Sequence, residues 1–153
     1  MWNFTNKSGE KKICLRPEVT AIIQELWNDG WCKTVKKPYK LFYVSRCYRY
    51  DRPQMGRYRE FTQFGVEILR KTTDDVVQEA KQTLIQCLQD LDIEFEFIDE
   101  VVRGIGYYTE EGFEAECSLL GAQKQIAGGG RYNEGVGWAI GVDRVSLIKK
   151  LSN

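Results

Sequence analysis

Apolar and polar positions recur with two different periods along the chain, and these periods predict strands and helices. The plainest strand pattern is IEFEFI at residues 93–98, where apolar and acidic side chains alternate. Aromatic and β-branched residues are dense at 39–48 and again at 58–69, as is typical of strands. Shorter runs predict further strands at residues 11–15, 110–119, 124–130 and 136–140, with a short strand and turn within 1–10.

Three other segments carry apolar residues at helical spacing. The first helix is predicted to open at Arg16-Pro17-Glu18, with Pro17 in its first turn, and to stop at Gly30. Glu18 and Thr20 would then lie in that first turn. Helices and strands follow no regular alternation, so the sequence predicts a single α+β domain over residues 1–153. The other two helices are predicted at residues 72–90 and from residue 141 to about 151.

A loop rich in turn-forming residues joins the two aromatic strands, which predicts a hairpin. Side chains two positions apart share one face of a strand. Phe61, Gln63 and Glu67 are therefore expected to line one surface, which would serve as the floor of a ligand site. Gly65 lies between them and is expected to leave space.

Basic residues gather around this hairpin. Lysine and arginine dominate residues 33–59, where Asp51 is the single acid, whereas acids dominate residues 71–117. An anionic ligand is thus favoured locally although the net charge is zero, and that zero total argues against broad non-specific DNA binding. Guanidinium groups around the loop could grip a polyphosphate, but a hairpin with a solvated basic tip fits the same pattern. The arginines concerned are Arg49, Arg52, Arg57 and Arg59.

The residue types present exclude several kinds of chemistry. The chain has no histidine, which rules out histidine acid–base catalysis, Ser–His or Cys–His pairs and imidazole metal sites. The five cysteines are scattered without a CxxC pair, so reduced thiols are favoured over disulfides or zinc ligands. No apolar run approaches the roughly 20 residues of a membrane span, and the N-terminal segment lacks the apolar core of a signal peptide. We therefore expect a cytoplasmic protein without membrane partners.

Two further features suggest contact with a ligand. Gly128, Gly129 and Gly130 end a predicted strand next to Arg131, and glycine permits a close approach between backbone and ligand. A bulge or tight corner would use the same residues. Arg144 lies in the first turn of the last predicted helix, where a cation opposes the helix dipole. An anionic or π-stacking ligand would account for its position.

Five segments combine arginine, glycine and aromatic residues in distinctive order: LRPEVT at 15–20, YRYDRPQMGRYREFTQ at 48–63, VRGIGYY at 102–108, GGGRY at 128–132 and GWAIGVDR at 137–144. Together they resemble the catalytic core of histidyl-tRNA synthetase, a class II aminoacyl-tRNA synthetase. The resemblance implies an antiparallel β-sheet flanked by helices. It also implies that histidine and ATP, with Mg²⁺, form histidyl-adenylate and pyrophosphate, followed by transfer to tRNA(His). Members of the family are homodimers.

The resemblance assigns roles to individual residues. Arg49 would hold the α-phosphate and the histidine carboxylate, and Arg103 would lie beside the α-phosphate, so both are candidate catalytic residues. Glu67 and Tyr108 would recognise the imidazole. The candidate ATP-binding residues are Arg49, Arg57, Phe61 and Arg144, with Phe61 and Arg144 on the two faces of the adenine. The candidate histidine-binding residues are Glu18, Thr20, Gln63, Glu67, Tyr107 and Tyr108, of which the first three would hold the ammonium group.

The implied chemistry agrees with a chain that lacks histidine. A substrate carboxylate is already ionised, so its attack on phosphorus needs positioning and cations rather than a protein base. The main alternative is a non-catalytic histidine sensor, like the regulatory subunit of ATP phosphoribosyltransferase, and a tRNA-binding fragment without chemistry is a third reading. Gly106 and Asn133 stand where the family usually has aspartate. The family's first class motif, helical insertion and anticodon-binding domain have no counterpart in residues 1–153, so we expect a catalytic domain alone.

Overall fold

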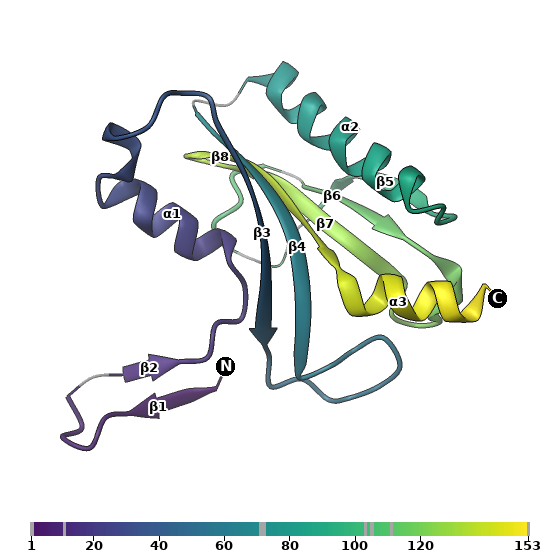
Figure 1. Cartoon of the computed structure of the whole chain (residues 1–153), viewed down its shortest axis with the longest axis horizontal. Coiled ribbons are helices and arrows are strands. Elements are labelled where there is room, and N and C mark those ends of the chain that lie inside the picture. Colours follow the sequence, from purple (N-terminus) through teal and green to yellow (C-terminus); the bar gives the residue numbers. More distant parts are fainter. Residues whose placement is uncertain are drawn as a thin grey trace.

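The computed structural model describes residues 2–10, 12–70, 73–102, 104, 106–110 and 112–152. Within these residues, six strands form one antiparallel sheet in the order β3-β4-β8-β7-β6-β5, and a separate hairpin pairs β1 with β2 (Figure 1). This sheet, with helices packed against it, confirms the predicted α+β fold. The strands are β1 Asn3–Thr5, β2 Lys12–Cys14, β3 Tyr39–Tyr48, β4 Glu60–Leu69, β5 Glu96–Val101, β6 Gly112–Glu116, β7 Gln125–Tyr132 and β8 Gly135–Gly141.

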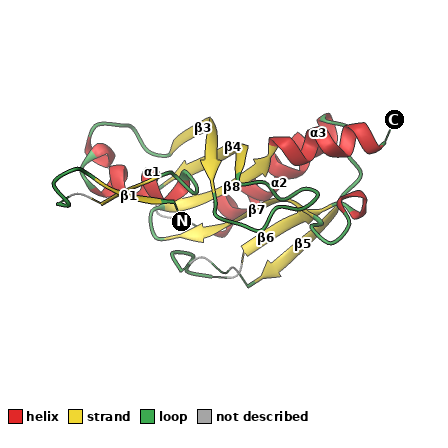
Figure 2. Cartoon of the chain, turned by 90° about the horizontal axis from the view of Figure 1, so that it is seen from below, coloured by secondary structure: helices red, strands yellow, loops and turns green. Residues whose placement is uncertain are grey.

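Helices cover both faces of the sheet. The helices are α1 Thr20–Asn28, α2 Asp74–Asp90 and α3 Val142–Leu151, with short 3₁₀ turns η1 Trp31–Lys33 and η2 Ser118–Leu120. Ile68 and Leu69 are consecutive on β4, so they point to opposite faces. Ile68 packs in a core with α2 and α3, whereas Leu69 packs in a second core with α1. Figure 2 shows α1 and the β1–β2 hairpin at one end of the molecule and α3 at the other.

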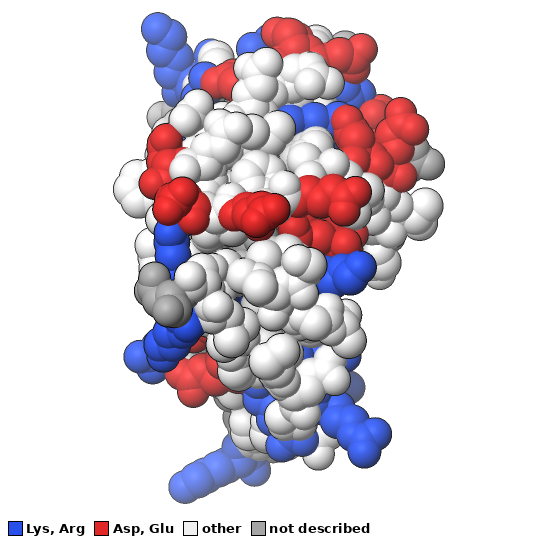
Figure 3. Space-filling view, turned by 90° about the vertical axis from the view of Figure 1, so that its right-hand side faces the viewer, with Lys and Arg blue, Asp and Glu red and all other residues white. Residues whose placement is uncertain are grey.

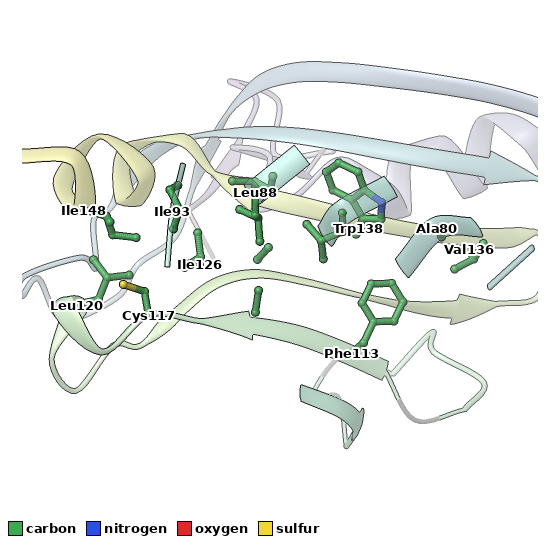
Figure 4. Close-up of a cluster of buried hydrophobic side chains, with 14 of the residues drawn as sticks. Ala80, Leu88, Ile93, Phe113, Cys117, Leu120, Ile126, Val136, Trp138 and Ile148 are labelled. Carbon is green, nitrogen blue, oxygen red and sulfur yellow. The ribbon is translucent and has the colours of Figure 1, made fainter. Parts of the chain in front are cut away.

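The larger core fills the space between the sheet and α2 and α3. α2 contributes an apolar stripe that includes Ala80, Leu84 and Leu88, each at most 1% exposed. Trp138 on β8 and Phe113 on β6 meet this stripe from the sheet (Figure 4). Burial of such side chains stabilises the fold by about 1.5–3 kcal/mol each. The residues of β8 that point to the opposite face are glycine and alanine, so that face carries no bulky side chain.

The first helix begins later than the sequence predicts. α1 starts at Thr20 with Val19 as its N-cap, so Glu18 precedes the helix and does not lie in its first turn. Pro17 therefore belongs to the segment that leads into the helix. The backbone there is held by β3, because the Arg16 carbonyl accepts a hydrogen bond from the Tyr48 N–H. This contact extends the chain at the point where helix formation was expected.

Two predicted strands are also misplaced. The strand expected at 93–98 forms at Glu96–Val101, because the chain first closes α2 with Asp92 at positive φ and buries Ile93 in the core. The strand expected at 110–119 is reduced to Gly112–Glu116, and the chain then turns through η2 to bury Leu120. The first aromatic strand, by contrast, spans Tyr39–Tyr48 as predicted. The other strands begin and end within two residues of their predicted bounds. Residue 11, with which one of these strands was predicted to begin, lies outside the described residues.

Candidate active site

A cavity opens on the face of the sheet that carries α1. Its walls come from β3, β4, β7 and β8, from the segment before α1, from the loop between β3 and β4, and from the first turn of α3. Most of the residues chosen from the sequence meet there. The cavity-lining candidates are Glu18, Thr20, Arg49, Arg57, Phe61, Gln63, Tyr107, Tyr108 and Arg144. Arg103 lies outside the described residues.

β4 supplies the floor as its alternation predicts. Phe61 and Gln63 line the cavity, and both lie on the face that Leu69 shares with α1. The space expected above Gly65 is filled, however. A Cβ atom at Gly65 would lie 2.2 Å from Cζ of Tyr43, because the Tyr43 ring crosses from β3 over this glycine. Gly65 is thus required by a protein side chain, and the expectation of open space was wrong.

β7 and β8 complete the floor with small residues. Gly128, Ala139 and Gly141 line the cavity. Gly129 is demanded by packing, because a Cβ atom there would lie 2.5 Å from the Gly137 carbonyl oxygen. Gly130 is similar, since its Cβ would meet the Tyr108 ring at 2.7 Å. The bulge or tight corner expected as the alternative is absent, because β7 pairs regularly with β8 through all three glycines. Ligand approach fits Gly128, and packing against protein atoms accounts for the other two.

Three arginines converge around the β3–β4 loop. The Arg144 Nε–H donates to the Gly56 carbonyl and its Nη1–H to the Gln125 carbonyl, both at 2.6 Å. Burial lowers the pKa of Arg144, and the nearby charges of Arg49 and Arg57 lower it further. Like charges held this close favour an anionic ligand, which would relieve their repulsion. The Arg49 guanidinium also lies 5.0 Å from the centre of the Phe61 ring.

Acidic and hydroxyl groups form a second set. The Tyr107 hydroxyl donates to Glu18 Oε2 at 2.8 Å. Glu67 is fully buried, and its two carboxylate oxygens accept hydrogen bonds from Thr20 Oγ1 and the Tyr132 hydroxyl, each at 2.6 Å. Burial raises the pKa of Glu67 to about 7. Glu67 itself does not line the cavity but lies behind residues that do.

The sequence reasoning missed several residues of the site. Tyr132 holds Glu67, and Tyr43 forms part of the cavity wall. Asp143 accepts a hydrogen bond from the Thr62 N–H at 2.6 Å and so ties the start of α3 to β4. Tyr132 lay inside the GGGRY segment, which gave a usable signal. Tyr43 had none, because alternation within β3 does not show which residue of β4 its ring will cross.

Charge is segregated over the surface. Figure 3 shows most of the acidic side chains of one face in its upper half, whereas lysine and arginine are scattered there and predominate in the lower half. In the part of the chain that the structure describes, no three Asp, Glu, Cys or His residues are grouped so as to hold a metal ion by themselves. The helices in that part are also too short or too polar to cross a membrane.

Comparisons with known proteins identify the family. The model of the class II tRNA synthetase core domain (G, H, P, S and T) matches residues 3–135. A histidine–tRNA ligase of Archaeoglobus fulgidus is 26% identical in an alignment 250 positions long, gaps included, which covers 95% of this chain and 61% of that protein. The chain therefore spans about three fifths of the length of this relative. The resemblance noted from the motifs is confirmed.

Solved structures show the same fold. The apo histidyl-tRNA synthetase of S. aureus has a TM-score of 0.81 at 19% identity, covering 99% of this chain and 61% of the other. An ATP phosphoribosyltransferase regulatory subunit/histidyl-tRNA synthetase from Bacillus halodurans C has a TM-score of 0.80 at 16% identity, covering 99% and 68%. At these identities the likeness concerns the fold. Because the family model covers most of the sequence, this chain belongs to the family of class II tRNA synthetase core domains.

Proposed function

We propose that this chain activates histidine with ATP, forming histidyl-adenylate and pyrophosphate. The observation that carries the proposal is that one cavity brings together a set of guanidinium groups and a set of carboxylate and hydroxyl groups. The first set suits a triphosphate, because arginine stays protonated and offers donors in a fixed fork. The second set suits the ammonium and imidazole groups of histidine, since both donate hydrogen bonds. Histidine–tRNA ligases among the relatives support the choice of amino acid.

The proposed step needs no protein nucleophile. A carboxylate oxygen of histidine attacks the α-phosphorus, a new P–O bond forms, and the bond to the β-phosphate bridging oxygen breaks with its electron pair on pyrophosphate. Arg49 would stabilise the charge that develops on the α-phosphate, and the motif resemblance assigns the same task to Arg103. Phe61 and Arg144 would hold the adenine between them. Fixed cations aimed at developing charge lower the barrier without reorganisation.

ATP normally reacts as its Mg²⁺ complex, and Mg²⁺ is usually held by one or two carboxylates together with substrate phosphates. The cavity offers such carboxylates next to its arginines in Asp51 and Asp143. These residues would hold the ion together with the phosphates, and the ion would neutralise part of their negative charge. The chain's own arginines would then position the α-phosphate.

Transfer of histidine to tRNA(His), homodimer formation and a cytoplasmic site are further parts of the proposal. They rest on the family resemblance, in which the adenylate is the acyl donor for the tRNA. The histidine–tRNA ligase of Archaeoglobus fulgidus named above is one such relative. The adenylation step can be tested by itself, because its reversal returns pyrophosphate to ATP without any tRNA.

The test is histidine-dependent exchange of labelled pyrophosphate into ATP by the purified chain. We expect exchange in the wild type and a loss of about 100-fold or more in Arg49→Ala, the scale seen when a transition-state donor is removed. Arg46→Ala is the matched control, because Arg46 is exposed, pairs with Glu60 at 3.1 Å and does not line the cavity. Equal losses in both variants would contradict the role of Arg49. Arg103→Ala should abolish exchange but leave histidine binding largely intact.

A histidine sensor without catalysis is the second candidate function. The observation that favours it is the shared fold of the Bacillus halodurans protein, whose title names a regulatory subunit as well as a synthetase. Calorimetric binding of histidine without exchange would support this function and overturn the first. The retention of three arginines in the cavity favours catalysis, since sensing histidine alone requires no phosphate-binding set.

A further inference from the structure

Tyr43 forms a wall of the cavity that no sequence motif marks. Its side chain leaves β3 and crosses the neighbouring strand, where Gly65 makes room for it. With any side chain at position 65, the ring could not occupy this place, because even a Cβ atom would lie 2.4 Å from the Tyr43 hydroxyl oxygen. The ring is therefore fixed between β4 and the cavity.

The same ring stands near the buried carboxylate of Glu67. Glu67 has no exposed surface, and one cavity-lining residue contacts it directly. Thr20 donates a hydrogen bond to Glu67 Oε1, and Tyr43 lies close enough for Glu67, together with burial, to raise the pKa of its phenol. Tyr43 and Thr20 therefore lie between the cavity and the carboxylate.

From this arrangement we propose that Tyr43 is a specificity-determining residue, whose ring sets the depth of the amino-acid pocket at the end nearest Glu67. This inference rests on the proposed function and deepens it. The ring fills the volume over Gly65, so a ligand side chain that reaches towards Glu67 would meet the phenol instead of open space. Ring atoms added to such a ligand would collide with the phenol. Glu67 would then select the ligand side chain by its hydrogen-bond donors, and Tyr43 would select it by its size.

The test compares histidine with its two ring N-methyl derivatives in the pyrophosphate exchange assay, with calorimetric binding as a second readout. We expect the kcat/KM of the wild type to be about 10- to 200-fold lower for at least one methyl derivative than for histidine. This is the usual effect of one added methyl group in a tight pocket. Tyr43→Ala should reduce this discrimination by about 10-fold or more, because it opens the volume over Gly65. Tyr43→Phe keeps the ring and should retain the discrimination within about 3-fold, since volume rather than polarity is at issue.

Discrimination that is unchanged in a folded Tyr43→Ala chain would overturn the inference, with folding checked by thermal unfolding. If Tyr43→Ala does not fold, Tyr43→Leu takes its place, because leucine keeps apolar contacts but lacks the reach across Gly65. Equal loss of discrimination in Tyr43→Phe would also overturn it, since the hydroxyl and not the ring would then select. A wild type that neither binds nor uses histidine refutes the proposed function itself. Normal use of histidine with unchanged discrimination in the alanine variant refutes only the role of Tyr43.

Discussion

At the scale of single residues, Glu67 is the most unusual group in the molecule. A carboxylate without exposed surface normally requires a cation or several donors. Glu67 has two donors, Thr20 and Tyr132, at 2.6 Å. Burial outweighs both, so the pKa rises to about 7 instead of falling. A ligand that brings a further N–H donor would complete its coordination.

The raised pKa predicts how stability depends on pH. Protonated Glu67 is favoured by the fold, so its stabilising contribution is complete below pH 4.5, the unfolded value, and is lost as pH rises through about 7. The rise of the pKa from 4.5 to about 7 corresponds to roughly 3 kcal/mol. Glu67→Gln should remove this part of the pH dependence. Urea unfolding of both proteins at pH 5 and pH 7.5 measures it, and parallel pH profiles would show that the buried carboxyl does not titrate in this range.

At the scale of the elements, the sequence predicts strands that have a regular local pattern, but it does not predict the contacts between elements. Tyr39–Tyr48 was predicted to the residue because its composition and alternation depend on that strand alone. Glu96–Val101 was displaced because burial of Ile93 under α2, a tertiary contact, overrides the alternating pattern. In the site, Phe61 and Gln63 followed from strand periodicity. Tyr43 did not, because its place depends on the registry of two strands.

Packing of α2 against the sheet provides a test at this scale. Leu84 is fully buried in the larger core, at the centre of the apolar stripe of α2. Leu84→Ala should lower the free energy of unfolding by about 2–5 kcal/mol, because it leaves a cavity as well as losing contacts. Leu26→Ala is the matched control, because Leu26 is 52% exposed on α1 and its truncation should cost much less. Denaturant unfolding measures both, and similar losses would contradict the assignment of the core.

At the scale of the whole molecule, charge is divided between two regions. The basic hairpin borders the cavity, and most of the acidic residues lie between residues 71 and 117. The charges cancel in sum, with 22 basic and 22 acidic residues and no histidine. The basic region of one molecule can attract the acidic region of another, because molecules without net charge do not repel each other.

We therefore expect solubility to be lowest near pH 6.4, the isoelectric point of the sequence. Lys36 is exposed and lies outside the cavity lining, so Lys36→Glu should move the minimum to lower pH without loss of fold. The turbidity of concentrated samples, followed over about three pH units from pH 5 to 8, measures the pH of lowest solubility in both proteins. Added salt should raise solubility at the minimum by screening the attraction. A minimum at the same pH in both proteins would refute this view.

The two hydrogen bonds of Arg144 have a consequence for the kinetics of nucleotide binding. They fasten the tip of the β3–β4 loop, through the Gly56 carbonyl, to the beginning of β7. The loop therefore loses its conformational entropy when the chain folds and not when a nucleotide arrives. ATP would meet a preorganised site, so its association rate should be limited by diffusion and charge rather than by loop ordering.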